Sequence, residues 1–247
     1  MRKKPLILSV TSGKGGVGKT FTTVNLASAL ARRKKKILVV DCDLGLANID
    51  IMLGISPPYT LQDVIFGDKK LKDIIVTTTG GFDLVPSSSG VRDMAQLLFE
   101  KIETIKSMIR ELAEYDIILL DTGAGISEVV LQFNLLASKN IVIINKELTC
   151  LTDAYSMIKV MFQVFGRDHF SIIANAVSNQ KEATRLFTHI NSICTKFLGF
   201  DLLYAGHIIH DELASRSILT QKIAFLAAPD SEIAGNFKLI SDNVVSW

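Results

Sequence analysis

The chain has 247 residues, of which 48% are hydrophobic, and a net charge of +2. The hydrophobic content allows a large core, while the small net charge gives no support for a nucleic-acid-binding protein. No apolar run reaches the roughly 18 residues that a membrane-spanning helix needs, which argues against an integral membrane protein. Three cysteines without a CxxC pair are typical of a reducing compartment, so we expect a cytoplasmic protein. No linker or repeat interrupts the chain, which predicts one domain over residues 1–247.

Short apolar runs alternate with amphipathic stretches, a pattern typical of βαβ units around a parallel sheet. The apolar runs predict buried strands at residues 6–10, 37–40, 117–120, 141–144, 171–174 and 203–209, with a further candidate at 82–85. The amphipathic stretches predict helices at residues 19–33, 91–114, 126–137, 152–165, 181–197, 212–220 and 231–245. We therefore predict a doubly wound α/β fold with a mostly parallel sheet of seven or eight strands, which binds its ligand at the carboxyl ends of the strands.

A glycine-rich loop, Gly13-Lys14-Gly15-Gly16-Val17-Gly18-Lys19-Thr20, joins the first predicted strand to the first predicted helix. Glycines let backbone N–H groups approach phosphate oxygens, and the helix N-terminus adds partial positive charge. Lys19 would neutralise the β- and γ-phosphate oxygens, and the Thr20 hydroxyl would ligate Mg²⁺. The loop thus predicts a P-loop for ATP or ADP with Mg²⁺. We expect the nucleotide to contact Gly13, Lys14, Gly15, Gly16, Val17, Gly18, Lys19, Thr20 and Phe21.

Acidic residues end two later strands. Asp41 and Asp43 follow the second strand, and side chains two positions apart in a strand point the same way, here toward the phosphate site. Such carboxylates can bind Mg²⁺ through water or orient an attacking water. Asp121 closes the apolar run 117–120 in the pattern of a Walker B strand. The predicted magnesium group is therefore Thr20, Asp43 and Asp121.

The second lysine of the loop, Lys14, makes it resemble the deviant Walker A motif KGGxGK[ST] of the MinD/ParA-type ATPases. The resemblance implies a homodimer in the ATP state, in which Lys14 reaches the partner's nucleotide and stabilises transition-state charge. It also implies that Asp43 positions the hydrolytic water, with Asp41 in support. We therefore predict Lys14 and Asp43 as the catalytic residues.

The same resemblance implies an adenine pocket made of residues that end two later strands. Asn175 ends the strand at 171–174 and Asp211 follows the last strand, where the family reads the base. Without the resemblance, either residue could be a turn former.

Several segments resemble MinD-type sequences, and among them the MinD-like regulators of flagellar number and placement called FlhG or FleN. These are residues 43–50, 52–54, 86–90, 121–126, 151–155 and 244–247. The resemblance implies a slow ATPase switch that restrains flagellar assembly and gene expression. The implied partners are a flagellar transcriptional activator, a signal-recognition-type GTPase or a basal-body protein.

Two alternatives remain open, a MinD-type regulator of the division site and a ParA-type DNA partition ATPase. The DLGLANID segment at residues 43–50 argues against DNA as a partner, because ParA-type chains carry a DPQG-like segment there. The family grips the inner face of the membrane through a basic amphipathic helix, which would follow Trp247. We expect peripheral membrane contact only where such a helix is present.

Overall fold

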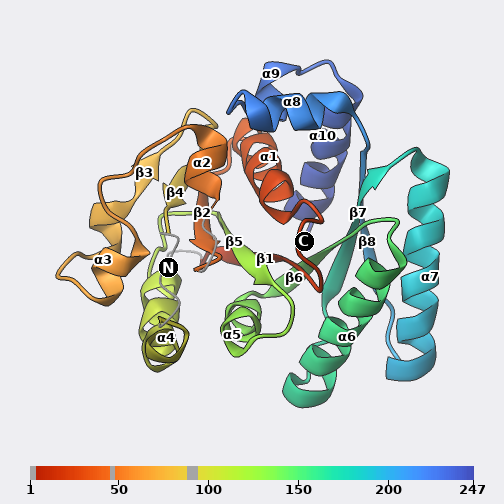
Figure 1. The fold of residues 1–247 in the computed structure, drawn as a ribbon, viewed down its shortest axis with the longest axis horizontal. Helices are drawn as coiled ribbons and strands as arrows, with labels where there is room; N and C mark the ends of the chain where they lie inside the picture. Colours follow the sequence, from red (N-terminus) through yellow and green to blue (C-terminus); the bar gives the residue numbers. More distant parts are fainter. Residues whose placement is uncertain (1–3, 45–47, 88–93) are drawn as a thin grey trace.

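A sheet of eight strands runs through the middle of the molecule over residues 4–44, 48–87 and 94–247, which the computed structural model describes (Figure 1). Its order is β3-β4-β2-β5-β1-β6-β7-β8, and only β3 pairs antiparallel, with β4. The strands are β1 (Leu6–Ser12), β2 (Ile37–Cys42), β3 (Val76–Thr77), β4 (Asp83–Val85), β5 (Ile117–Ala124), β6 (Lys139–Ile144), β7 (Phe170–Val177) and β8 (Leu203–Ile209). The predicted strands and the doubly wound, mostly parallel α/β fold are confirmed.

Helices cover both faces of this sheet. Figure 1 shows α1 (Lys19–Arg32), α8 (Glu212–Leu219), α9 (Ala224–Ala227) and α10 (Glu232–Val245) above it. Below it lie α4 (Met94–Arg110), α5 (Glu128–Leu136) and α6 (Leu148–Phe165), and α7 (Gln180–Leu198) runs along the right-hand side. At one end of the sheet lie α2 (Ile49–Leu53), α3 (Leu61–Ile65) and the 3₁₀ turn η1 (Leu71–Ile74). The strand–helix alternation along the chain therefore produces a three-layer molecule.

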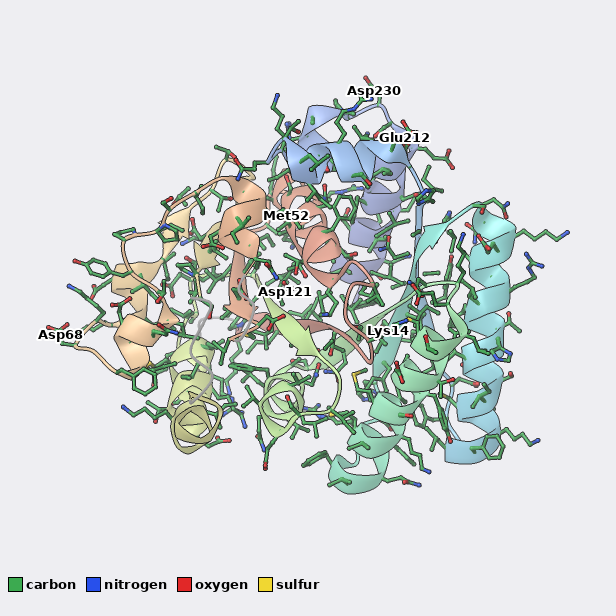
Figure 2. All side chains as sticks on the ribbon, viewed as in Figure 1. Lys14, Met52, Asp68, Asp121, Glu212 and Asp230 are labelled. Carbon is green, nitrogen blue, oxygen red and sulfur yellow. The ribbon has the colours of Figure 1, made fainter. Side chains whose placement is uncertain are left out.

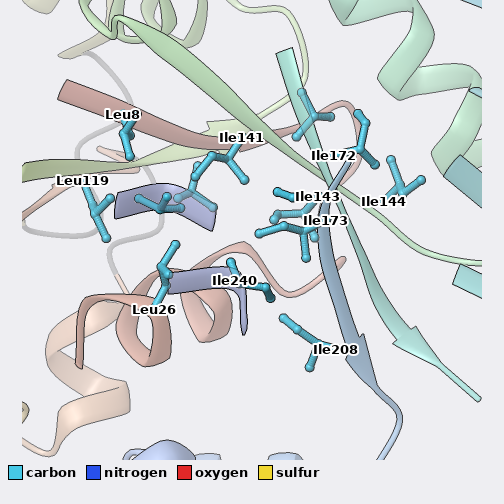
Figure 3. Packing of buried hydrophobic residues seen from close by; sticks show 14 of the residues in the cluster. Leu8, Leu26, Leu119, Ile141, Ile143, Ile144, Ile172, Ile173, Ile208 and Ile240 are labelled. Carbon is cyan, nitrogen blue, oxygen red and sulfur yellow. The ribbon is translucent and has the colours of Figure 1, made fainter. Parts of the chain in front are cut away.

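Burial on both faces explains the continuous apolar runs of the central strands. In β5, Ile117 and Leu119 belong to one buried cluster while Ile118 and Leu120 belong to another, because alternate side chains point to opposite faces. Figure 3 shows part of the first cluster, in which Leu26 of α1 and Ile240 of α10 pack against the strands. This packing fixes the position of α1 against the sheet.

The elements that sequence analysis missed are short. They are α2, α3, η1, α9 and β3, each of two to five residues. The helix predicted from residue 152 begins at Leu148 instead, so its first turn contains Thr149. The predicted start of the helix at residue 91, and parts of the flagellar-type segments at 45–47 and 88–90, lie outside the described residues.

Candidate functional site

The glycine-rich loop lies where expected, between the end of β1 at Ser12 and the start of α1 at Lys19. Gly18 caps α1 with a φ of 94°, a left-handed conformation that favours glycine. A Cβ at Gly18 would also lie 2.2 Å from Nδ2 of Asn175, whose amide donates to the Val17 carbonyl at 2.7 Å. The end of β7 therefore braces the loop in a conformation that only glycine can adopt here.

Lys19 is buried at the first position of α1, with 8% of its surface exposed. Burial lowers its pKa, while the carboxylates of Asp121 and Asp43 act in the opposite direction. A buried ammonium group needs anionic or hydrogen-bonding partners. Lys19 is thus placed to bind phosphate at a helix N-terminus.

The magnesium candidates form one group of oxygen ligands. The Thr20 hydroxyl donates to Oδ2 of Asp121 at 2.8 Å. Burial raises the pKa of Asp121, and the nearby carboxylate of Asp43 raises it further. Hydroxyl and carboxylate oxygens are the ligands that Mg²⁺ takes, usually beside substrate phosphates. These residues therefore fit Mg²⁺. Sequence analysis missed Thr23, whose hydroxyl lies 2.8 Å from the other Asp121 oxygen; its spacing of four residues from Lys19 could have indicated it.

Asp41 differs from its expected orientation. It is buried and lies outside the pocket lining, whereas Asp43 lines the pocket. Its two oxygens accept the backbone N–H groups of Asp43 at 3.1 Å and Ile49 at 3.4 Å. The alternation of side chains fails because β2 ends at Cys42, one residue before Asp43. Asp41 therefore ties together the two ends of the segment that carries Asp43.

Lys14 points away from the phosphate region of its own chain. Its Nζ pairs with Oε2 of Glu147 and donates to the Thr149 hydroxyl at 2.9 Å, both at the start of α6. The side-chain hydrogen bond to Glu147 raises the pKa of Lys14. Figure 2 shows Lys14 on the loop, on the side toward α6, and Asp121 separately on β5. Glu147 and Thr149 are thus contacts that sequence analysis did not find.

Asp211 has a local role in the structure. Its carboxylate accepts the Leu213 N–H at 2.9 Å and caps the N-terminus of α8. Asp211 lies two residues beyond the end of β8, whereas Asn175 lies inside the neighbouring strand β7, which continues to Val177 instead of ending at residue 174. Neither lines the pocket described next.

A pocket of about 900 Å³ opens at this edge of the sheet. Its polar part includes Lys19, Thr20 and Asp43, and its apolar part includes Met52 of α2 and Leu219 of α8. The remaining lining residues are Gly15, Gly16, Gly18, Phe21, Asn48, Ile51, Gly123, Ala124, Ser127, Val130, Ile218 and Gln221. The volume lies in the range of small-molecule and cofactor sites.

Replacing Asp121 by Asn is expected to stabilise the metal-free protein at neutral pH. Burial raises the pKa of Asp121 to about 6, so the native state binds a proton that the unfolded chain releases near pH 4. The contribution of Asp121 to the wild-type free energy of unfolding therefore falls as pH rises from about 4 to about 6. Above pH 6 this destabilisation stays constant. Denaturant unfolding should show the variant about 2 kcal/mol more stable at about pH 7.5, with the difference vanishing near pH 4. A pH-independent difference would contradict this account.

Known proteins are similar to this chain over most or nearly all of its length. A family model described as an AAA domain matches residues 6–165. The antiactivator FleN of Pseudomonas aeruginosa is 35% identical over 98% of this chain and 86% of its own. The flagellum site-determining protein YlxH of Helicobacter pylori is 29% identical over 97% of this chain and 81% of its own. Among solved structures, the septum site-determining protein MinD of Pyrococcus horikoshii, complexed with Mg-ADP, is 28% identical with a TM-score of 0.82, covering 96% of this chain and 95% of that one.

In the described part of the chain, no helix combines the length and the apolar character needed to cross a bilayer. The loop, the oxygen ligands and the eight-stranded sheet agree with the similarity in sequence and structure. This chain therefore belongs to the MinD/ParA-type P-loop ATPases, in the branch that contains the antiactivator FleN.

Proposed function

We propose that this chain is an ATP-dependent switch that dimerises in the ATP state, hydrolyses ATP slowly and regulates flagellar number, placement and gene expression. The observation that carries the proposal is that Lys14 does not line the phosphate pocket of its own chain. Its side chain contacts the start of α6 instead. Similarity to FleN and YlxH over nearly the whole chain supports the flagellar role. We infer that residues 1–247 act as one cytoplasmic ATPase domain.

In the proposed reaction, Lys19 and the loop amides hold the phosphates, and Asp43 orients the attacking water. Water attacks the γ-phosphorus, the bond to the bridging oxygen breaks, and ADP and phosphate leave. Bound Mg²⁺, held by Thr20, Asp43 and Asp121, would neutralise charge on the phosphates. The partner subunit's Lys14 stabilises the negative charge of the transition state, as an arginine finger does.

We retain Asn175 and Asp211 as the proposed adenine contacts. Asn175 lies near the carboxyl end of β7 and Asp211 just beyond the parallel strand β8, and Asn175 already touches the loop at Val17. Asp211 additionally caps α8, which contributes Ile218 and Leu219 to the pocket. The base would then lie between the ends of β7 and β8 and the start of α8.

A division-site regulator of the MinD type is the second candidate. The observation that favours it is the likeness to Pyrococcus MinD over 96% of this chain. The two candidates share the ATPase chemistry and differ in the partner that the dimer recruits. Partner capture therefore separates them.

The test is capture from the native cell extract with an Asp43→Ala bait held in Mg·ATP, compared with the same bait in ADP. Loss of the water-orienting carboxylate should keep the bait in its ATP state. We expect a flagellar transcriptional activator, flagellar GTPase or basal-body protein to bind only with ATP. A Lys19→Ala bait in ATP is the matched control, because it lacks the buried phosphate-binding cation. ATP-dependent recovery of division proteins or DNA would overturn the flagellar assignment and keep the switch.

A further inference from the structure

Thr23 lies one turn into α1, fully buried, on the face that also carries Lys19. Its hydroxyl oxygen lies 2.8 Å from Oδ1 of Asp121 and 3.0 Å from the Lys19 carbonyl. A hydroxyl has one hydrogen to donate, and a charged acceptor gives the stronger bond. The carboxylate of Asp121 is therefore the favoured acceptor.

Asp121 is held at both of its oxygens by hydroxyls of the same helix. Thr20 donates to Oδ2 and Thr23 donates to Oδ1, each at 2.8 Å. The terminal torsion of an Asp side chain is broad, so one hydrogen bond alone leaves the carboxylate free to rotate. Two anchors from a rigid helix set its plane.

The two hydroxyls differ in what else they must do. Thr20 lines the pocket and belongs to the proposed magnesium group, whereas Thr23 lies outside the pocket lining. When the Thr20 hydroxyl coordinates Mg²⁺, the hydrogen bond from Thr23 still orients the carboxylate of Asp121. Such outer contacts commonly affect metal affinity by about 10- to 100-fold.

We propose that Thr23 is a positioning residue of the magnesium site, which fixes Oδ1 of Asp121 so that Oδ2 faces the hydroxyl of Thr20. The inference rests on the proposed Mg·nucleotide binding. A purely structural Thr23 would make a different prediction, because its hydroxyl could bond the Lys19 carbonyl within the helix and affect stability alone.

The neighbouring Thr22 provides a matched control. It is equally buried in α1, and its hydroxyl oxygen has no hydrogen-bond partner among the described residues. Thr22→Val and Thr23→Val therefore make the same chemical change one residue apart, and only the second removes a contact to Asp121. Thr23→Ser keeps the hydroxyl and removes the methyl group.

The experiment measures ADP affinity in EDTA and in Mg²⁺, which gives the magnesium enhancement of binding for each variant. Thr23→Val is expected to reduce this enhancement about tenfold while leaving affinity in EDTA within about twofold. Thr23→Ser and Thr22→Val should keep the wild-type enhancement. If Thr23→Val does not fold, Thr23→Ala is used in the same measurement.

An unchanged enhancement in Thr23→Val, or an equal loss of affinity with and without Mg²⁺, would overturn the positioning role. A wild-type protein that binds ADP without any magnesium enhancement would overturn the magnesium site itself, and this inference with it. A wild-type protein that does not bind ADP would overturn the proposed function. The wild-type arm therefore separates failure of the proposed function from failure of the role of Thr23.

Discussion

A Lys14→Ala variant is expected to bind ATP as the wild type does and to hydrolyse it at least about a thousandfold more slowly. Lys14 is absent from the pocket lining of its own chain and contacts Glu147 and Thr149 instead. Its removal should therefore spare the monomer's nucleotide affinity and abolish the charge stabilisation supplied across the dimer. Equilibrium ATP binding and steady-state phosphate release measure the two effects separately.

Mixing two inactive variants tests whether Lys14 acts across the dimer. Lys14→Ala retains Asp43, and Asp43→Ala retains Lys14, so a hybrid dimer contains one site with both groups. Half of randomly associated dimers are hybrids with one complete site of two, so the mixture should recover about a quarter of the wild-type rate. A mixture as inactive as either variant alone, although hybrids form, would show that Lys14 acts within its own chain.

Most of the fold could be predicted from the sequence because its long elements carry their own signal. Strands buried on both faces read as continuous apolar runs, as at Ile117–Leu120, and a long surface helix such as α7 shows clear amphipathic periodicity. The elements that were missed span five residues or fewer, too few for any period to appear. These pieces are held by tertiary packing, which a single sequence does not display.

The candidate site, too, contains residues that the sequence could predict and contacts that it could not. Lys19, Thr20 and Asp121 were predictable because motif spacing and the ends of parallel strands bring them together. The orientation of Asp41 was not, because it depends on where β2 ends relative to Asp43. Contacts between distant segments, such as Lys14 with Glu147, depend on how α6 packs beside the loop, 133 residues further along the chain.

The backbone of α6 leaves no space for a side chain at Gly13 of the loop. A Cβ built on Gly13 would lie 2.1 Å from the backbone carbon of Asp153, 2.3 Å from its oxygen and 2.5 Å from the nitrogen of Ala154. These atoms belong to the α6 backbone and cannot turn aside as a side chain can. Gly13 itself does not have a positive φ, so lack of space alone excludes a side chain here.

A Gly13→Ala variant is therefore expected to separate the loop from α6, lowering the free energy of unfolding by about 3 kcal/mol. The displaced loop should also bind nucleotide at least about tenfold more weakly, since phosphate binding depends on the position of its backbone N–H groups. Gly15→Ala is the matched control for stability, because nothing lies within 4 Å of its Cβ position and its φ is not positive. We expect its unfolding free energy to stay within about 0.5 kcal/mol of wild type. Denaturant unfolding of both variants measures the contrast, and equal stability of the two would show that α6 yields to the added methyl group.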